Sequence, residues 1–127
     1  MKMNSIIFEL KPLLIEEGYK FREADKSLFI ELPNGFGELQ IYDLEDNDDV
    51  VGLAGSEWHT HSECLGDPDL PRTNKIIEFL SKIFSGQYLL IEEQEPGKKP
   101  RKSIEEDLRS YLKWLPKNST YRVFNKT

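Results

Sequence analysis

The segment LFIELPNGFGELQIYDL, residues 28–44, decides the fold class of this chain. Residues 28–32 and 36–44 each place aliphatic side chains at every second position, which is the period of a β-strand that buries one face. Between them stands Pro33-Asn34-Gly35, and Asn and Gly tolerate the positive φ angles that tight turns require. The segment therefore predicts two antiparallel strands joined by a short turn.

Strand patterns on both sides extend this hairpin into a sheet. Residues 19–22 precede it, and residues 50–55 follow it after an acidic turn. Before them, residues 4–17 carry apolar side chains near helical spacing and end at Gly18, although Pro12 would kink such a helix. The first half of the chain is therefore expected to form one helix and an antiparallel meander of four strands.

The second half is expected to alternate helices with strands. The clearest helix lies within residues 71–86 and has an apolar stripe along one side, and residues 88–91 read as a short strand. Ser103 and Glu106 have the spacing of a capping box, which predicts a further helix that begins at Ser103 after a polar loop. Residues 121–124 are expected to form a last strand.

These elements predict an α+β fold with a mainly antiparallel sheet of about five to six strands and helices packed on one face. The chain has 127 residues, and its 38% of hydrophobic residues can supply a core for a domain of that size. We therefore expect residues 1–127 to form a single domain.

Charge is distributed unevenly along the chain. From Ser27 to Pro71 there are eleven acidic residues and no Lys or Arg, whereas the net charge of the whole chain is only −6. Solvated loops and outward strand faces are one interpretation of this run, and an acidic surface that attracts a basic protein partner is the other. The residues expected to bind such a partner are Asp43, Glu45, Asp46, Asp48, Asp49 and Trp58.

Composition also limits the classes of partner and the cellular compartment that we expect for this protein. The net negative charge argues against nucleic acid as a partner, because Lys and Arg supply most of that affinity. Cys64 is the only cysteine, so no intramolecular disulfide can form, and a cytoplasmic location is expected. The sequence contains no apolar run of about eighteen residues, so no membrane partner is expected.

The two histidines of the chain stand two residues apart. If this segment is extended, Glu57, His59, His61 and Glu63 share one face. Two imidazoles at this spacing can bind one zinc ion, and a carboxylate could complete the site while bound water supplies the nucleophile. In the alternative interpretation no cofactor binds, Trp58 packs in the core, and the histidines face solvent or hydrogen-bond to neighbours.

The run Glu57-Trp58-His59-Thr60-His61 resembles part of the JAMM/JAB metalloprotease signature. In that signature His-x-His is followed by a proline and later by a serine and a zinc-binding aspartate. Here Ser62 stands in place of the proline, and Arg72 occupies the position of the aspartate. The resemblance implies a metal-dependent hydrolase, but a required metal ligand is absent from its expected position.

A second resemblance covers more of the chain. Small bacterial proteins of unknown or toxin-immunity type carry a Trp-His-x-His segment after a β-meander, then an Ile-rich helix ending in Gly and a strand with Glu-Glu. Residues 55–61, 76–86 and 88–93 are similar to that arrangement. This resemblance implies binding of a partner without catalysis.

The leading hypothesis is therefore a cytoplasmic bacterial protein that works by binding and not by catalysis. In this hypothesis it is an immunity-like protein whose acidic middle region covers a basic toxin such as a nuclease. Two alternatives stay open, a metal-dependent hydrolase that uses His59 and His61, and a structural domain without catalysis.

Overall fold

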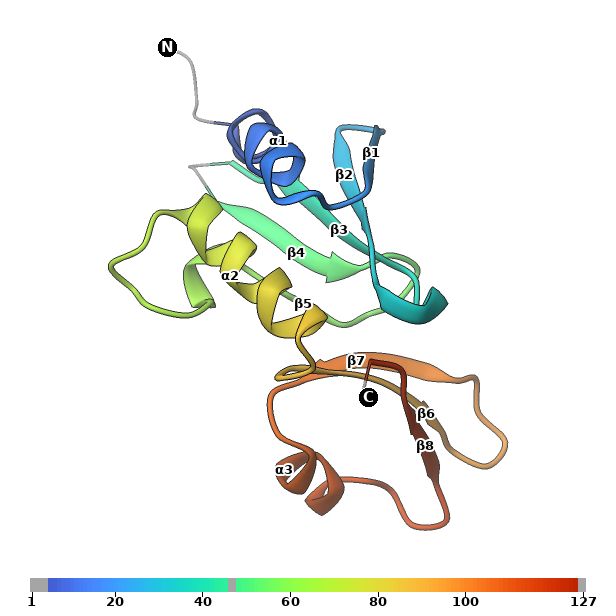
Figure 1. The fold of residues 1–127 in the computed structure, drawn as a ribbon. Coiled ribbons are helices and arrows are strands. Elements are labelled where there is room, and N and C mark those ends of the chain that lie inside the picture. The colour runs from blue at the N-terminus through green and yellow to red at the C-terminus, as the bar shows by residue number, and fades with distance from the viewer. Residues whose placement is uncertain (1–4, 46–47, 126–127) are drawn as a thin grey trace.

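Segment 28–44 forms two neighbouring strands of a five-stranded antiparallel sheet in the computed structural model, which describes residues 5–45 and 48–125. The strands follow one another across the sheet in chain order (Figure 1). They are β1 (Phe21–Ala24), β2 (Ser27–Glu31), β3 (Glu38–Asp43), β4 (Asp49–Leu53) and β5 (His59–Thr60). Leu28 lies opposite Ile41, so the aliphatic side chains of β2 and β3 fall on the same face. The predicted meander is confirmed.

The turn between β2 and β3 is the short 3-10 helix η1 (Pro33–Gly35). Asn34 and Gly35 have φ angles of 57° and 71°, in the left-handed region that Asn and Gly adopt with least strain. The side-chain amide of Asn34 also donates a hydrogen bond to the carbonyl oxygen of Phe124. The turn predicted from local sequence is confirmed, and it makes a long-range contact as well.

Two helices cover one face of the five-stranded sheet (Figure 1). They are α1 (Ile6–Glu17) and α2 (Arg72–Phe84). Their buried side chains meet those of β2, β3 and β4 in one core, formed mainly by Ile6, Leu10, Leu14, Leu28, Ile30, Leu39, Ile41, Val51, Ile76, Leu80 and Ile83. Burial of this apolar surface is the main force that holds the helices on the sheet.

Pro12 lies inside α1 without ending it. The helix begins after Ser5, whose hydroxyl accepts a hydrogen bond from the N–H of Phe8, and it ends at Gly18 with a φ angle of 80°. Phe8, whose carbonyl loses its helical donor at Pro12, is 78% exposed, so water can replace that donor. The helix therefore tolerates the proline.

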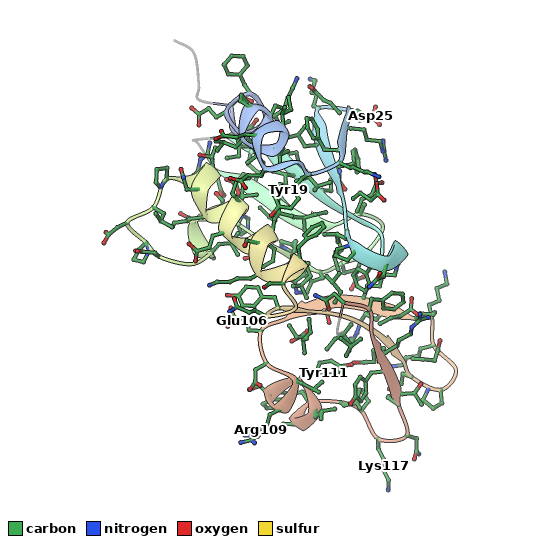
Figure 2. All side chains as sticks on the ribbon, viewed as in Figure 1. Tyr19, Asp25, Glu106, Arg109, Tyr111 and Lys117 are labelled. Carbon is green, nitrogen blue, oxygen red and sulfur yellow. The ribbon has the colours of Figure 1, made fainter. Side chains whose placement is uncertain are left out.

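The remaining strands form a second, three-stranded antiparallel sheet in the order β7-β6-β8. Its elements are β6 (Leu89–Gln94), β7 (Arg101–Glu105), the helix α3 (Leu108–Lys113) and β8 (Thr120–Val123). Tyr111 extends from α3 toward the strands and packs with Leu89 and Ile91 (Figure 2). Leu90 and Ile104 join the core of the first half instead. The α+β class with antiparallel strands is confirmed, and the strands divide between two sheets.

Ser103 does not begin a helix, so the capping-box prediction is wrong. It pairs with Ile91 inside β7. α3 begins after Asp107, whose carboxylate accepts hydrogen bonds from the N–H groups of Arg109 and Ser110. Pairing with a neighbouring strand satisfies the backbone around Ser103, and this long-range pairing outweighs a local motif worth only a few hydrogen bonds.

Candidate functional site

A buried carboxylate organises the region around the histidines. Asp49 begins β4, on the same face as the core residue Val51, and is 1% exposed. Its oxygens accept hydrogen bonds from the backbone N–H of Ser62 at 2.7 Å, from the Ser62 hydroxyl, and from Arg72 Nη1 at 3.0 Å. A buried charge is tolerated when it is paired and hydrogen-bonded in this way. Asp49 therefore ties the two ends of the segment 62–72 to the sheet.

The histidine segment is extended only as far as His61. His59 faces Gly52 across the β4–β5 pair, and Trp58 packs against the core, where it stacks on Phe79. A Cβ atom at Gly52 would lie 3.1 Å from the Trp58 carbonyl oxygen, so the glycine allows β5 to approach closely. The expected alternation of Trp58 with the two histidines is present.

Both imidazoles are engaged by neighbouring groups. His59 Nδ1 lies 3.1 Å from the carbonyl oxygen of Glu57. His61 Nδ1 contacts the carbonyl oxygen of Asp49 and lies 3.4 Å from Asp48 Oδ1. The two rings are 5.8 Å apart between centroids and almost perpendicular. This arrangement agrees with histidines that hydrogen-bond to their surroundings.

The carboxylates expected to complete a metal site do not join the histidines. The 3-10 helix η2 (Ser62–Cys64) begins directly after His61, so the period of two stops there and Glu63 stands exposed on the turn. Glu57, which precedes the histidines in the chain, is exposed. Within residues 5–45 and 48–125, no three His, Cys, Asp or Glu side chains are grouped so that they could hold a metal ion.

The acidic residues expected to bind a partner have different environments. The carboxylate of Asp43 accepts hydrogen bonds from the hydroxyl of Ser5 and the N–H of Ile6, so it anchors the start of α1 to β3. Asp49 is buried, Glu45 is exposed, and Asp48 lies partly exposed beside His61. Asp46 lies outside the described residues. Two of these acids are therefore used inside the fold, and two remain accessible.

The acids that reach solvent on the turn before β4 and on the loop 62–72 are only partly those singled out from the sequence. We call this group the acidic rim, and it comprises Glu45, Asp48, Glu63, Asp67 and Asp69. Two basic side chains of this region bind other groups: Arg72 binds the buried carboxylate of Asp49, and Lys75, which is 6% exposed, donates to the carbonyl oxygen of Glu63 at 3.1 Å. Within residues 5–45 and 48–125 the rim carboxylates form no ion pair with Lys or Arg, so the rim keeps its negative charge.

A cavity of about 450 Å³ lies where β7 and α3 meet the segment after β4. Its lining includes Trp58 and Trp114, the only two tryptophans in the chain. Trp114 directly follows α3 and is 85% exposed. Sequence reasoning singled out Trp58 and missed Trp114, although the scarcity of tryptophan was a usable signal, because this residue is common in binding sites.

Two groups in this cavity form a buried pair. Glu93 on β6 is 5% exposed, accepts a hydrogen bond from the Tyr111 hydroxyl at 2.7 Å, and pairs with Arg101 at 2.8 Å. Burial, together with the hydrogen bond to Glu93 and the negative charges of Glu93 and Glu105, raises the pKa of Tyr111 far above its usual value. Tyr111 therefore stays protonated and positions Glu93; it is not a general base at neutral pH.

No protein-family model matches this chain, and no curated protein or solved structure shows detectable similarity to it. The helices in the described ranges are all too short or too polar to cross a membrane.

Proposed function

We propose that the protein acts by binding another protein that presents basic side chains, as an immunity-like protein does when it covers a toxin. The observation that carries the proposal is the negative charge that the acidic rim exposes to solvent. The acidic rim faces solvent, and within the described residues no Lys or Arg forms an ion pair with any of its carboxylates. A surface with uncompensated charge of one sign attracts partners of the opposite sign and speeds their association.

The arrangement of the acids also supports a surface of defined shape. Asp49 holds Ser62 and Arg72, so both ends of the loop that carries Glu63, Asp67 and Asp69 are attached to the sheet. Asp67 Oδ1 further accepts a hydrogen bond from the N–H of Asp69 at 2.9 Å. Charged side chains on an ordered loop lose less conformational entropy on binding than charged side chains on a flexible loop.

The test uses a variant in which three exposed rim residues are reversed, Glu45→Lys, Glu63→Lys and Asp69→Lys. In extracts of the cells that make this protein, at low ionic strength, we expect the wild type to capture a basic protein that this variant does not. With that partner purified, the association rate of the variant should be lower by about tenfold or more, and the difference should shrink in high salt.

A matched control reverses three exposed acids elsewhere, Glu16→Lys, Glu17→Lys and Glu31→Lys, and so changes the net charge equally. It should bind as the wild type does, because these residues lie on α1 and β2, outside the rim. Equal binding by the wild type and the rim variant would reject the proposal. Equal loss from both variants would show a response to net charge alone and would also reject it.

A further inference from the structure

The cavity beside Trp114 is lined by different residues from those of the acidic rim. Its walls come from the segment after β4, from β7 and from α3, and no rim residue lines it. A volume of about 450 Å³ is sufficient for a small ligand or for a long side chain of a partner. The indole of Trp114 at its edge offers apolar surface that water now covers.

The two cations that line the cavity both contact other groups of the protein. Arg101 pairs with the buried carboxylate of Glu93. The ammonium group of Lys102 donates to the carbonyl oxygen of Phe36, and it lies 5.0 Å from the centre of that ring. Both cations are therefore held by groups of the protein, but only Arg101 is paired with a carboxylate, and Lys102 keeps its positive charge.

Two carboxylates of the cavity are in the opposite situation. Glu57 is exposed and Glu105 is partly buried, and within the described part of the chain neither side chain has a hydrogen-bond or ion-pair partner. The charge of Glu105 contributes to the raised pKa of Tyr111, which agrees with its position on the cavity wall. Three carboxylates (Glu57, Glu93 and Glu105) and two cations (Arg101 and Lys102) line the cavity, so its net charge is negative.

Aromatic faces and unpaired carboxylates together select for cations. An indole is the best side chain for attracting a cation to its face, and a nearby carboxylate adds a direct ion pair. We propose that the Trp58–Trp114 cavity binds a guanidinium or alkylammonium group, with the tryptophans contacting the cation and Glu57 and Glu105 pairing with it. The same chemistry is found in the Arg and Lys side chains of proteins and in free amines.

The test follows the indole N–H signals of the two tryptophans in a ¹⁵N–¹H correlation spectrum. Both tryptophans line the cavity, so both signals report on it. The probes are agmatine and the peptide acetyl-Gly-Arg-Gly-amide, and the neutral control is the same peptide with citrulline in place of arginine. We expect at least one cationic probe to shift both signals in a saturable way, and citrulline to leave them unchanged.

The relative affinity of the probes distinguishes the two sources of the cation. Tighter binding of the arginine peptide would support a protein side chain as the natural occupant, and tighter binding of agmatine would support a free amine. Either result supports a cation site. No shift with either cation at about 10 mM, where even a millimolar site would be mostly filled, would overturn the proposal, as would equal shifts with citrulline.

Variants distinguish a specific effect of the cavity residues on probe affinity from a general effect of net charge. Glu57→Gln and Glu105→Gln should each weaken binding of the cationic probe about threefold to fivefold, and Trp114→Leu by a similar factor. Glu16→Gln removes one charge from α1 and should leave the affinity unchanged. Unchanged affinity in all three cavity variants would overturn the proposal. The result does not depend on the acidic rim, so either idea can fail alone.

Discussion

Arg72 Nη1 lies 3.0 Å from Asp49 Oδ2, and the carboxylate side chain of Asp49 is 1% exposed. This pair joins the first residue of α2 to the first residue of β4. Arg72 also occupies the position where the metalloprotease signature has its zinc-binding aspartate. A guanidinium group cannot ligate zinc, and here it stabilises a buried carboxylate beside the histidines instead.

Replacing Asp49 should destabilise the protein strongly. Asp49→Ala removes the carboxylate that Arg72 and the backbone N–H of Ser62 contact, so we expect the free energy of unfolding to fall by about 3–5 kcal/mol. Urea unfolding followed by circular dichroism measures this change. Glu45→Ala, on the exposed turn before β4, serves as the control and should stay within about 0.5 kcal/mol of the wild type. A similar loss in both variants would contradict the structural role of Asp49.

The hydroxyl of Tyr111 should contribute to stability through Glu93. Tyr111→Phe leaves one oxygen of a buried carboxylate without its donor, which should lower the free energy of unfolding by about 1–3 kcal/mol. Tyr121→Phe is the matched control, because its ring contacts that of Tyr111 but the side chain is 39% exposed. If the two variants unfold at the same urea concentration, the buried hydrogen bond contributes little.

Stability should also fall at alkaline pH because of Tyr111. The pKa of this phenol is raised in the folded protein by burial and by its hydrogen bond to Glu93. The unfolded chain releases the proton near pH 10, whereas the folded protein retains it. The contribution of Tyr111 is therefore complete below about pH 10 and is lost progressively as the pH rises above that value.

Urea unfolding of the wild type and Tyr111→Phe between about pH 9 and 11.5 tests this dependence. The wild type should lose stability more steeply than the variant. Some decline should remain in Tyr111→Phe, because burial and Glu17 raise the pKa of Tyr19 in the same direction. If the free energy of unfolding falls equally with pH in the two proteins, Tyr111 does not control the loss of stability at alkaline pH.

Asn125 should be essential for joining the end of the chain to α2 and β6. Its amide donates to the carbonyl oxygens of Ile83 and Tyr88 at 2.7 and 2.6 Å, and its oxygen accepts from the N–H of Leu90 at 2.9 Å. Asn125→Ala leaves buried backbone groups without partners and should cost about 2–3 kcal/mol in thermal or urea unfolding.

Asn125→Asp is the sharper variant at this position. At neutral pH it places a carboxylate against two carbonyl oxygens, so it should destabilise at least as much as Asn125→Ala, and it should recover in part when acid protonates it. Gln87→Ala, on an exposed residue before β6, should have little effect. A harmless Asn125→Asp would refute this role.

Zinc should not bind tightly at the histidine pair. Within the described residues no third His, Cys, Asp or Glu is grouped with the pair, and catalytic zinc sites use three protein ligands. We expect less than stoichiometric zinc in protein that is purified without a histidine tag and dialysed against zinc at micromolar concentration. Near-stoichiometric zinc that disappears in both His59→Ala and His61→Ala would instead favour the hydrolase alternative.

Sequence reasoning succeeded where the signal was local. The period of two in β2 and β3 and the Asn34-Gly35 turn were predicted correctly, because both depend on residues close together in the chain. The alternation of Trp58 with the histidines was also predicted. It could not be extended to Glu63, because the η2 turn depends on the contact of Ser62 with Asp49, thirteen residues away.

In the second sheet, by contrast, the local sequence predicted the wrong element. Ser103 has the sequence of a helix start but lies in a strand, because β7 pairs with β6 and this pairing satisfies its backbone. The charge run was equally ambiguous, since a like-charge stretch does not reveal which carboxylates are buried. Asp43 and Asp49 lie in the same run as Glu45, yet only Glu45 is left exposed.

The sequence by itself determined the antiparallel meander, the helices that cover it, and an excess of negative charge in the middle of the chain. These features follow from side-chain periodicity, turn conformation and composition, which act over short distances along the chain. Only the tertiary structure decided that Arg72 binds Asp49 and Lys75 the carbonyl of Glu63, and that Trp58 and Trp114 share one cavity. Such contacts join residues far apart in sequence, and they depend on how the two sheets and their helices pack together.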